Sequence, residues 1–233
     1  RLNRRQRQMC IRDRSWLDAP NLRQYAFKEH EGSYIVGIAA AKASKTGKVG
    51  FVGGMDIGLI RRFACGYVGG VKSVNASAEV YQNMTGTTPA AWNDPAKGAE
   101  LTQSQIDRGA DVVYHAAGGT GAGVIQAAAD AGKLAIGVDS NQNGMAPGSV
   151  LTSMLKRVDV AAYETFMDVK NGNFSAGVHV LGLAEGGVDW ALDENNASLV
   201  TADMKAAIES ARADIVSGKV KVHDYFSDES CPY

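Results

Sequence analysis

DVVYHAAGGTGAGVIQAA, residues 111–128, is the stretch that decides the fold class. Its first seven residues form a short apolar run rich in β-branched and aromatic side chains, which is typical of a buried strand. Glycines then mark a turn, and an Ala-rich segment continues as the start of a helix. A strand that passes through a glycine turn into a helix predicts the first half of a βαβ unit.

The same order of strand, turn and helix recurs along the chain from Gly47 onward. Near-helical spacing of Ile60, Phe63 and Tyr67, for example, predicts a helix between two of the strands. Strands that alternate with helices need crossover connections, which produce a parallel sheet with helices on both faces. The predicted fold class is therefore α/β. The other clear strands are KVGFVGG (48–54), AEVYQNMTG (78–86) and KLAIGVDSN (133–141).

Small, polar or glycine-rich turns follow five of the predicted strands. Ligands bind beyond the carboxyl ends of the strands in an open parallel sheet, so a site is expected at these turns. One glycine-rich turn carries little weight, because glycine is common in such connections, but five together favour a pocket lined by backbone amides. The turns are residues 53–56, 85–94, 117–121, 139–141 and 185–187.

Two side chains in these turns point to a small-molecule site. Trp92 lies in the polar loop TTPAAWNDP, where its ring either stacks on a ligand or anchors the loop by packing. Asp139 ends a strand, where a carboxylate serves as an acceptor for sugar hydroxyl groups. A carboxylate pair formed with Asp56 or Asp94 is the catalytic alternative for the same residue.

Further candidates flank the turns. His115 stands directly before the glycine turn and is a candidate to line the site, although one histidine does not define a mechanism. Lys156 is either a solvated helix residue or a cation that reaches the site from a second lobe. We identify no catalytic residue. The remaining candidates from the turns are Met55, Gly118, Gly119 and Gly186.

A nicotinamide-dependent enzyme with a Rossmann domain is the main alternative. The dinucleotide fingerprint Gly-x-Gly-x-x-Gly needs a third glycine where Val124 stands, and Gly123 comes one position early. Asp139 is at a suitable distance for an acid that binds the ribose. No Gly-Lys-Ser/Thr follows a glycine run, which argues against a phosphate-binding P-loop. The fingerprint is weak, and we expect no cofactor.

Composition indicates a soluble globular protein of one or two domains, with 233 residues, 45% hydrophobic residues and a net charge of −1. No apolar run of about 18 residues predicts a membrane-spanning helix. No CxxC pair or Cys/His cluster supports a metal site. Cys65 and Cys231 are either joined in a disulfide, which suits an oxidising compartment, or two separate thiols.

Residues 1–14, RLNRRQRQMCIRDR, differ from the rest of the chain in carrying six Arg against one Asp. A nucleic-acid-binding arm is disfavoured, because aromatic residues are not interleaved and the remaining chain is acidic. The segment resembles translated sequencing-adaptor sequence, so we expect an artefactual or disordered tail. The natural N-terminus, with any signal peptide or lipidated cysteine, would then be missing.

Six motifs in order along the chain resemble the basic membrane protein family of substrate-binding lipoproteins of ABC transporters, which includes receptors for purine nucleosides. The resemblance covers about residues 18–233. It implies a type I periplasmic-binding-protein fold, in which two Rossmann-like lobes with parallel sheets close on a ligand, and it implies no enzyme activity. The motifs are KVGFVGGMDIGLIRRFACGY, TGTTPAAWNDPAKG, HAAGGTGAGV, LAIGVDSNQN, LTSMLKRVDVAAYE and VLGLAEGGVDWALDE.

The resemblance also implies roles for individual residues. Trp92 matches the aromatic residue that stacks on the ligand, and Asp139 matches the carboxylate that takes ribose hydroxyls. Lys156 matches a lysine that enters from the other lobe. Gly118 and Gly119 match the backbone floor of the pocket, and Met55 and Gly186 line the remaining turns.

The chain departs from the family pattern because the opening Asn-Asp-x-x-Phe motif and most of the first lobe are absent. We therefore expect an incomplete N-terminal lobe formed by residues 18–46 and 149–172. Residues 47–148 and 173–233 would form a complete C-terminal lobe. Uncovered apolar surface should make such a chain poorly stable and a weak binder.

The sequence thus predicts a solute-binding protein that captures a nucleoside, with a purine nucleoside favoured, and delivers it to an ABC permease and its ATPase. Its expected location is the periplasm or cell envelope, held to the membrane only through a lost lipid anchor. No nucleic-acid partner is expected. The alternatives to this function are an NAD(P)-dependent oxidoreductase and a sensory domain with the same pocket.

Overall fold

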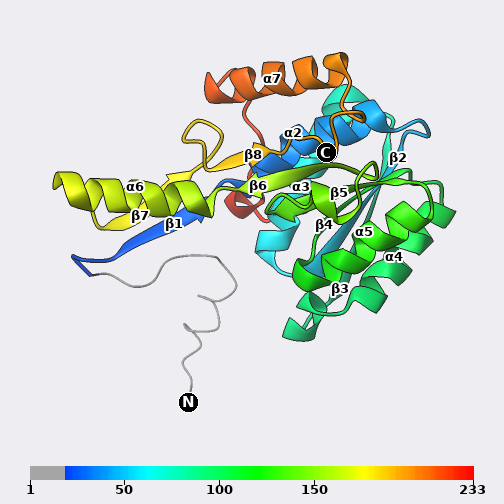
Figure 1. Cartoon of the computed structure of the whole chain (residues 1–233), viewed down its shortest axis with the longest axis horizontal. Coiled ribbons are helices and arrows are strands. Elements are labelled where there is room, and N and C mark those ends of the chain that lie inside the picture. Colours follow the sequence, from blue (N-terminus) through cyan, green and yellow to red (C-terminus); the bar gives the residue numbers. More distant parts are fainter. Residues whose placement is uncertain (1–18) are drawn as a thin grey trace.

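A six-stranded sheet forms the centre of the larger part of the molecule (Figure 1). Its strands are β2 (Lys48–Met55), β3 (Glu79–Gly86), β4 (Val112–Ala116), β5 (Leu134–Asp139), β6 (Val150–Lys156) and β8 (Val188–Trp190). They lie in the order β3-β2-β4-β5-β6-β8, and all neighbours are parallel except β6 and β8. The computed structural model describes residues 19–233, so the predicted tail at residues 1–14 lies outside the described residues.

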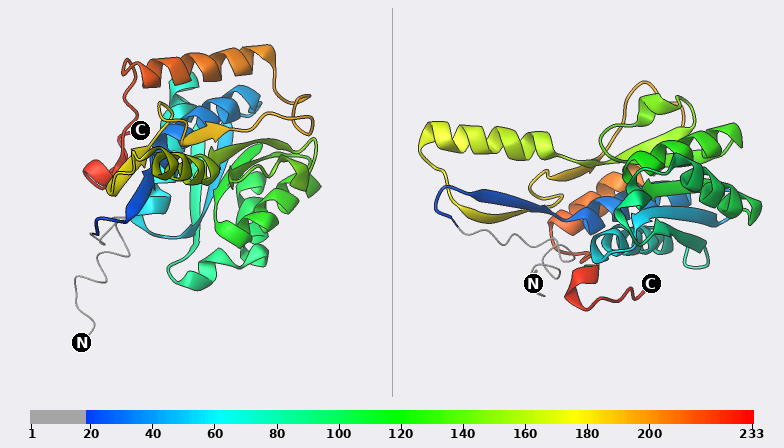
Figure 2. Two further views of the ribbon diagram at one scale, coloured as in Figure 1. Left: turned by 60° about the vertical axis from the view of Figure 1, so that its left-hand side comes forward. Right: turned by 90° about the horizontal axis from the view of Figure 1, so that it is seen from below.

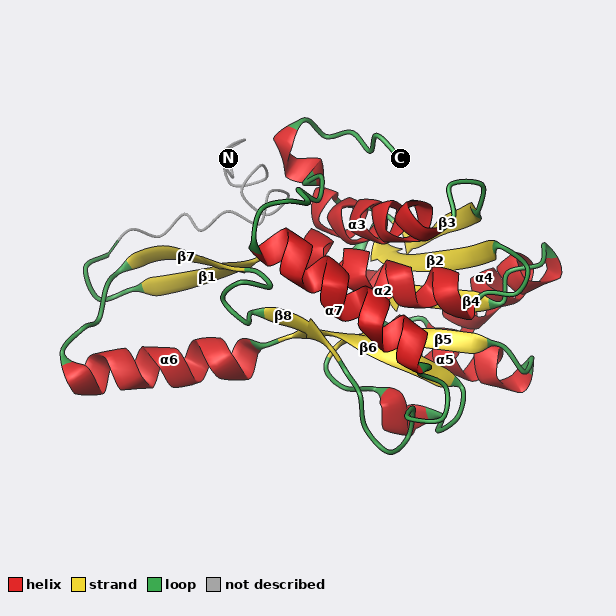
Figure 3. Cartoon of the chain, turned by 90° about the horizontal axis from the view of Figure 1, so that it is seen from above, coloured by secondary structure: helices red, strands yellow, loops and turns green. Residues whose placement is uncertain are grey.

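Helices cover both faces of this sheet, because successive side chains of a buried strand point to opposite sides. Tyr114 of β4 packs on Phe51 and Tyr67, with ring centroids 5.5 and 5.1 Å away. These rings lie on the face of the sheet that is covered by three helices, and Figure 3 shows these helices lying over the strands. The neighbouring Val113 packs with Val124 on the opposite face. The first face is covered by α2 (Glu29–Ala43), α3 (Gly58–Val74) and α7 (Ala202–Val216), and the second by α4 (Pro95–Asp107) and α5 (Gly121–Asp130).

Glycines bring α2 and α3 unusually close together. A Cβ at Gly37 of α2 would overlap the backbone carbonyl of Tyr67, and a Cβ at Gly70 of α3 would overlap that of Tyr34. Only glycine permits backbones to approach this closely. The two helices therefore pack as one layer over the six-stranded sheet.

A second, two-stranded sheet extends from the larger part of the molecule (Figure 2). It consists of β1 (Arg23–Phe27) and β7 (Gly177–Leu181), which pair in parallel, with α6 (Val158–Asn171) alongside. Arg23 donates to Asp168 at 2.6 Å, and the Tyr25 hydroxyl lies 2.8 Å from the Thr165 hydroxyl. These contacts join the helix to the small sheet.

The α/β fold with parallel sheets is confirmed, but the elements are distributed differently from the predicted domain boundaries. The predicted N-terminal lobe contains residues 29–43 and 150–156, whereas α2 and β6 belong to the larger unit. Strand β7, which the prediction assigns to the C-terminal lobe, pairs instead with β1. The difference arises because strand pairing and the close contact of α2 with α3 join residues far apart in the sequence, and local sequence patterns do not reveal such contacts. The lobe assignment itself stays a prediction.

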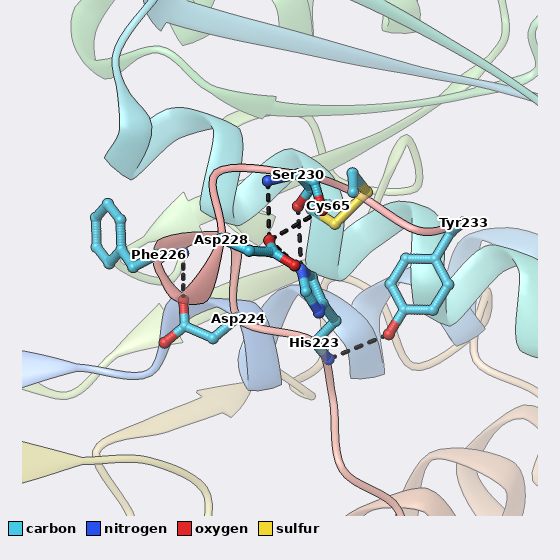
Figure 4. Close-up of a disulfide and its surroundings, with 8 residues drawn as sticks. Cys65, His223, Asp224, Phe226, Asp228, Ser230 and Tyr233 are labelled. Carbon is cyan, nitrogen blue, oxygen red and sulfur yellow. Dashed lines mark hydrogen bonds and ion pairs between the residues drawn. A yellow bond between two sulfur atoms is a disulfide. The ribbon is translucent and has the colours of Figure 1, made fainter.

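A disulfide fastens the C-terminal segment to α3 (Figure 4). Cys65 and Cys231 are bonded with their Cα atoms 5.6 Å apart, so of the two sequence alternatives the structure contains the bridged one. Tyr233 packs against Gly69 of the same helix, and its hydroxyl accepts a hydrogen bond from the backbone N–H of His223 at 3.1 Å. The short helix η4 (Tyr225–Ser227) lies within this segment.

Candidate functional site

The candidate site is the edge of the six-stranded sheet where the parallel strands end. Because β3, β2, β4, β5 and β6 run in the same direction, their carboxyl ends form one row. Gly186 lies beside the end of this row, since the neighbouring Gly187 carbonyl accepts a hydrogen bond from the Arg157 N–H at 2.8 Å. In order, the strands end at Gly86, Met55, the turn 117–119, Asp139 and Lys156.

Trp92 is held at this edge by the glycines beneath it. It ends the short helix η1 (Pro89–Trp92), and its half-buried indole lies against Gly54, where a Cβ would overlap the ring. A Cβ at Gly118 would come within 3.5 Å of the same ring. The Thr85 hydroxyl of β3 lies 2.8 Å from the Gly53 carbonyl of β2 and 3.1 Å from the Ala91 carbonyl of the loop, so it ties the loop to the strand ends. Trp92 thus packs on the strand ends and also forms part of the site's rim.

The glycine turn after β4 has two functions that the sequence does not separate. Gly118, with φ +57°, and Gly119 are exposed in the short helix η2 (Gly118–Thr120) and are available as a backbone floor. Gly121 and Gly123 serve packing instead. A Cβ at Gly121 would overlap the His115 ring, and one at Gly123 would overlap a backbone carbonyl at the start of α4.

Asp139 presents an exposed carboxylate at the centre of the edge. Its backbone has φ +64°, a value that residues other than glycine rarely adopt. Within residues 19–233, the carboxylate is influenced by burial and by the charge of Lys156 and by no hydrogen-bond donor. Surrounding protein atoms partly desolvate the Asp139 carboxyl and raise its pKa, while attraction to Lys156 acts in the opposite direction.

The other two carboxylates considered for this edge are already engaged. Asp56 accepts two hydrogen bonds from the Arg61 guanidinium, at 2.7 and 2.8 Å, and these lower the pKa of Asp56. Asp94 caps α4 by accepting from the Lys97 backbone N–H at 2.9 Å. Of the three, Asp139 therefore offers the open acceptor.

Lys156 reaches a buried ion-pair network. Its ammonium lies 2.9 Å from the Glu29 carboxylate, which is 0% exposed. Arg62 contacts the same carboxylate at 2.8 Å and also holds Asp224 through two hydrogen bonds of 2.8 Å each. Buried charges persist only when they are paired in this way. The network fixes Lys156 beside Asp139 and links it to the C-terminal segment.

Glu29, Arg62 and Asp224 are not among the site residues predicted from the sequence. For Glu29 the available signal is the polar run KEHEG (28–32), which follows the strand RQYAF (23–27) directly and begins a helix that is otherwise mostly apolar. Charged residues at such a junction are expected to be exposed. Their burial is visible only when the two sheets are placed in space.

His115 does not line the edge, contrary to its predicted place in the site. It is completely buried in β4, and Gln142 lies 3.0 Å from its Nε2 atom. Burial lowers the pKa of His115 to about 4, so the ring is neutral near pH 7. The reason is the alternation of side chains along β4: His115 points to the face covered by α4 and α5, where Gly121 of α5 packs directly on the ring.

Within residues 19–233, no group of three or more His, Cys, Asp or Glu side chains is arranged to hold a metal ion. The same residues contain no helix long and apolar enough to cross a bilayer.

Comparison with known proteins gives consistent family matches. The profile of the family described as "ABC transporter substrate-binding protein PnrA-like" matches residues 10–225. The "ABC transporter nucleoside-binding protein BmpA" of Lactococcus lactis is 36% identical over 223 residues, covering 88% of this chain and 61% of that protein. "Basic membrane protein D" of Borreliella burgdorferi is 34% identical over 206 residues, covering 87% and 59%. The chain thus spans about three fifths of the length of these relatives.

Solved structures agree on the fold. A solute-binding protein of an ABC transporter system from Aeropyrum pernix has a TM-score of 0.77 and 29% identity, covering 89% of this chain and 68% of that chain. A second solute-binding protein, from Conexibacter woesei, has a TM-score of 0.74 at 21% identity, covering 89% and 67%, and this likeness concerns the fold alone. The type I periplasmic-binding-protein fold is therefore confirmed.

Proposed function

Because the chain belongs to the family of PnrA-like ABC transporter substrate-binding proteins, we propose that it captures a purine nucleoside and delivers it to a membrane permease. Proteins of this family are substrate-binding components of transporters and not enzymes, so the nicotinamide-dependent enzyme is set aside. A relative named as nucleoside-binding, 36% identical to this chain, supports the choice of ligand class.

The open carboxylate of Asp139 is the observation that carries the proposal. A nucleoside offers vicinal ribose hydroxyls and an uncharged flat base, and it needs fixed acceptors for the first and an apolar surface for the second. Asp139 supplies the acceptor. Trp92, seated on Gly54 and Gly118, supplies a flat ring, and the exposed glycines supply backbone clearance.

The remaining candidates have supporting roles in this proposal. Lys156 lies beside Asp139, where its ammonium would donate to a polar group of the ligand. Met55 ends β2 next to the Trp92 loop and is half-buried. Gly186 has a φ of +68°, which suits glycine, and it forms the turn that lies beside the end of β6 at the strand-end edge of the sheet. Delivery to a permease with its ATPase, and an envelope location as a lipoprotein, complete the proposal on the basis of the family.

Ligand-detected NMR on this chain tests the proposal, because it registers weak as well as tight binding. Adenosine, guanosine and inosine should each bind, and Asp139→Asn should weaken binding by about tenfold or more, since it removes a charged acceptor. Asp107→Asn, an exposed carboxylate on α4, is the matched control and should change nothing. No response to any of the three nucleosides, together with binding of free ribose, would overturn the ligand class.

A further inference from the structure

The backbone at Asp139 is strained and must be held in place by its surroundings. Its φ is +64°, and the Ser140 N–H donates to the Val138 carbonyl two residues back at 2.8 Å. A positive φ at the middle of such a bond gives the strained form of the γ-turn, which is rare. Conformations of this kind persist only when neighbouring groups enforce them, and they cluster at binding sites.

Gln142 makes hydrogen bonds directly beside this turn. Its side-chain Oε1 accepts from the Val138 N–H at 2.8 Å and lies 3.0 Å from His115 Nε2. Since an amide oxygen is only an acceptor, His115 carries its proton on Nε2 and donates it to Gln142. The backbone N–H of Gln142 also donates to the Ser153 hydroxyl at 2.9 Å. One side chain thus connects the strand before the turn to the core of the sheet.

A second group of hydrogen bonds holds the far end of the same loop. Asp193 accepts from the Asn141 and Asn143 side-chain amides at 2.6 and 3.0 Å. The Ser153 hydroxyl donates to Asn143 Oδ1 at 2.9 Å. Because the loop is fixed at both ends, the residue between them has little freedom to relax from its strained conformation.

We propose that Gln142 is a positioning residue, which keeps the Asp139 turn strained so that the carboxylate points out of the sheet edge toward the ligand. That Asp139 binds a ligand rests on the proposed function. That Gln142 stabilises the turn at Asp139 does not depend on the proposed function. His115 acts through Gln142 as a buried support, which gives this histidine a role away from the ligand.

Two measurements test the proposal on the intact chain. In Gln142→Ala, the Ser140 amide, which Gln142 does not contact, should exchange with solvent about tenfold faster, and nucleoside affinity should fall by about the same factor. Gln142→Glu keeps an acceptor oxygen in the same place and should restore the protection of Ser140. Gln126→Ala, an exposed glutamine on α5, is the matched control and should match the wild type.

The outcomes separate this inference from the proposed function. A folded Gln142→Ala variant with unchanged Ser140 exchange overturns the positioning role. If Gln142→Ala does not fold, Gln142→Met, which fills the same space without an acceptor, replaces it and is judged by the same exchange rate. Faster Ser140 exchange in a protein that binds no nucleoside would support the positioning role while removing the proposed ligand.

Discussion

The imidazole of His115 is completely buried and lies between Gly121 and Gln142. This burial lowers the pKa of His115 to about 4 from an ordinary value of 6.5. Between these two values the unfolded chain binds a proton at this residue and the native protein does not. The free energy of unfolding should therefore fall as the pH decreases from about 6.5 to 4, by about 3 kcal/mol in total from this residue.

Urea unfolding at pH 7 and pH 4.5 measures this dependence. His115→Gln keeps an N–H donor toward Gln142 but does not titrate, so its loss of stability between the two pH values should be smaller than that of the wild type by about 2 kcal/mol. His179→Gln, in the small sheet, is the control and should behave like the wild type. Equal losses in all three proteins would contradict a buried neutral His115. The buried His30, whose pKa is lowered to about 3, contributes equally to all three.

At the scale of elements, the contact between α4 and α5 depends on Gly123. A Cβ at this position would overlap the Pro95 carbonyl, which is backbone and cannot rotate away. Gly123→Ala should therefore destabilise the protein by about 1–3 kcal/mol, although alanine favours a helix more than glycine does. Gly144→Ala is the control, since its nearest neighbour would be 3.9 Å away. Chemical unfolding that shows both variants equally stable would exclude the close packing.

Local patterns predict the elements of this fold well and their long-range contacts poorly. The strand and helix of residues 111–128 follow from apolar runs and glycines close in sequence, and so do the turns that carry Trp92 and Asp139. Arg62 and Asp224, by contrast, are 162 residues apart, and the only sequence feature that connects their neighbourhoods is the Cys65–Cys231 pair, which the sequence leaves open between a disulfide and two thiols. The direction of the His115 ring likewise depends on which neighbour packs on it.

At the scale of the whole molecule, the Cys65–Cys231 disulfide closes a loop of 166 residues. A cross-link over such a distance restricts the unfolded chain, so Cys65→Ser/Cys231→Ser should lower the free energy of unfolding by about 2–4 kcal/mol. The variant should also loosen the segment that carries Asp224. Urea unfolding under oxidising conditions measures the loss, with Cys10→Ser, which lies outside the described residues, as the control. Equal stability with and without the bridge would show that the C-terminal segment does not need it.

The small unit of β1, β7 and α6 exposes apolar side chains on α6 and on its two-stranded sheet. Phe166 is 75% exposed and Val169 59% exposed on α6, and Val178 is 53% exposed on β7. Exposed apolar surface of this kind promotes association between copies. We therefore expect this chain to self-associate as its concentration rises.

Light scattering coupled to size-exclusion chromatography, over a hundredfold range of loading concentration, tests this expectation. Phe166→Ser combined with Val178→Thr should shift the mean mass toward that of a monomer, because both substitutions shrink the apolar surface without touching the six-stranded sheet. Val216→Thr, 49% exposed at the end of α7, is the matched control and should leave association unchanged. A wild-type chain that stays monomeric at every concentration would mean that α6 and the small sheet do not bind one another between copies, despite their exposed side chains.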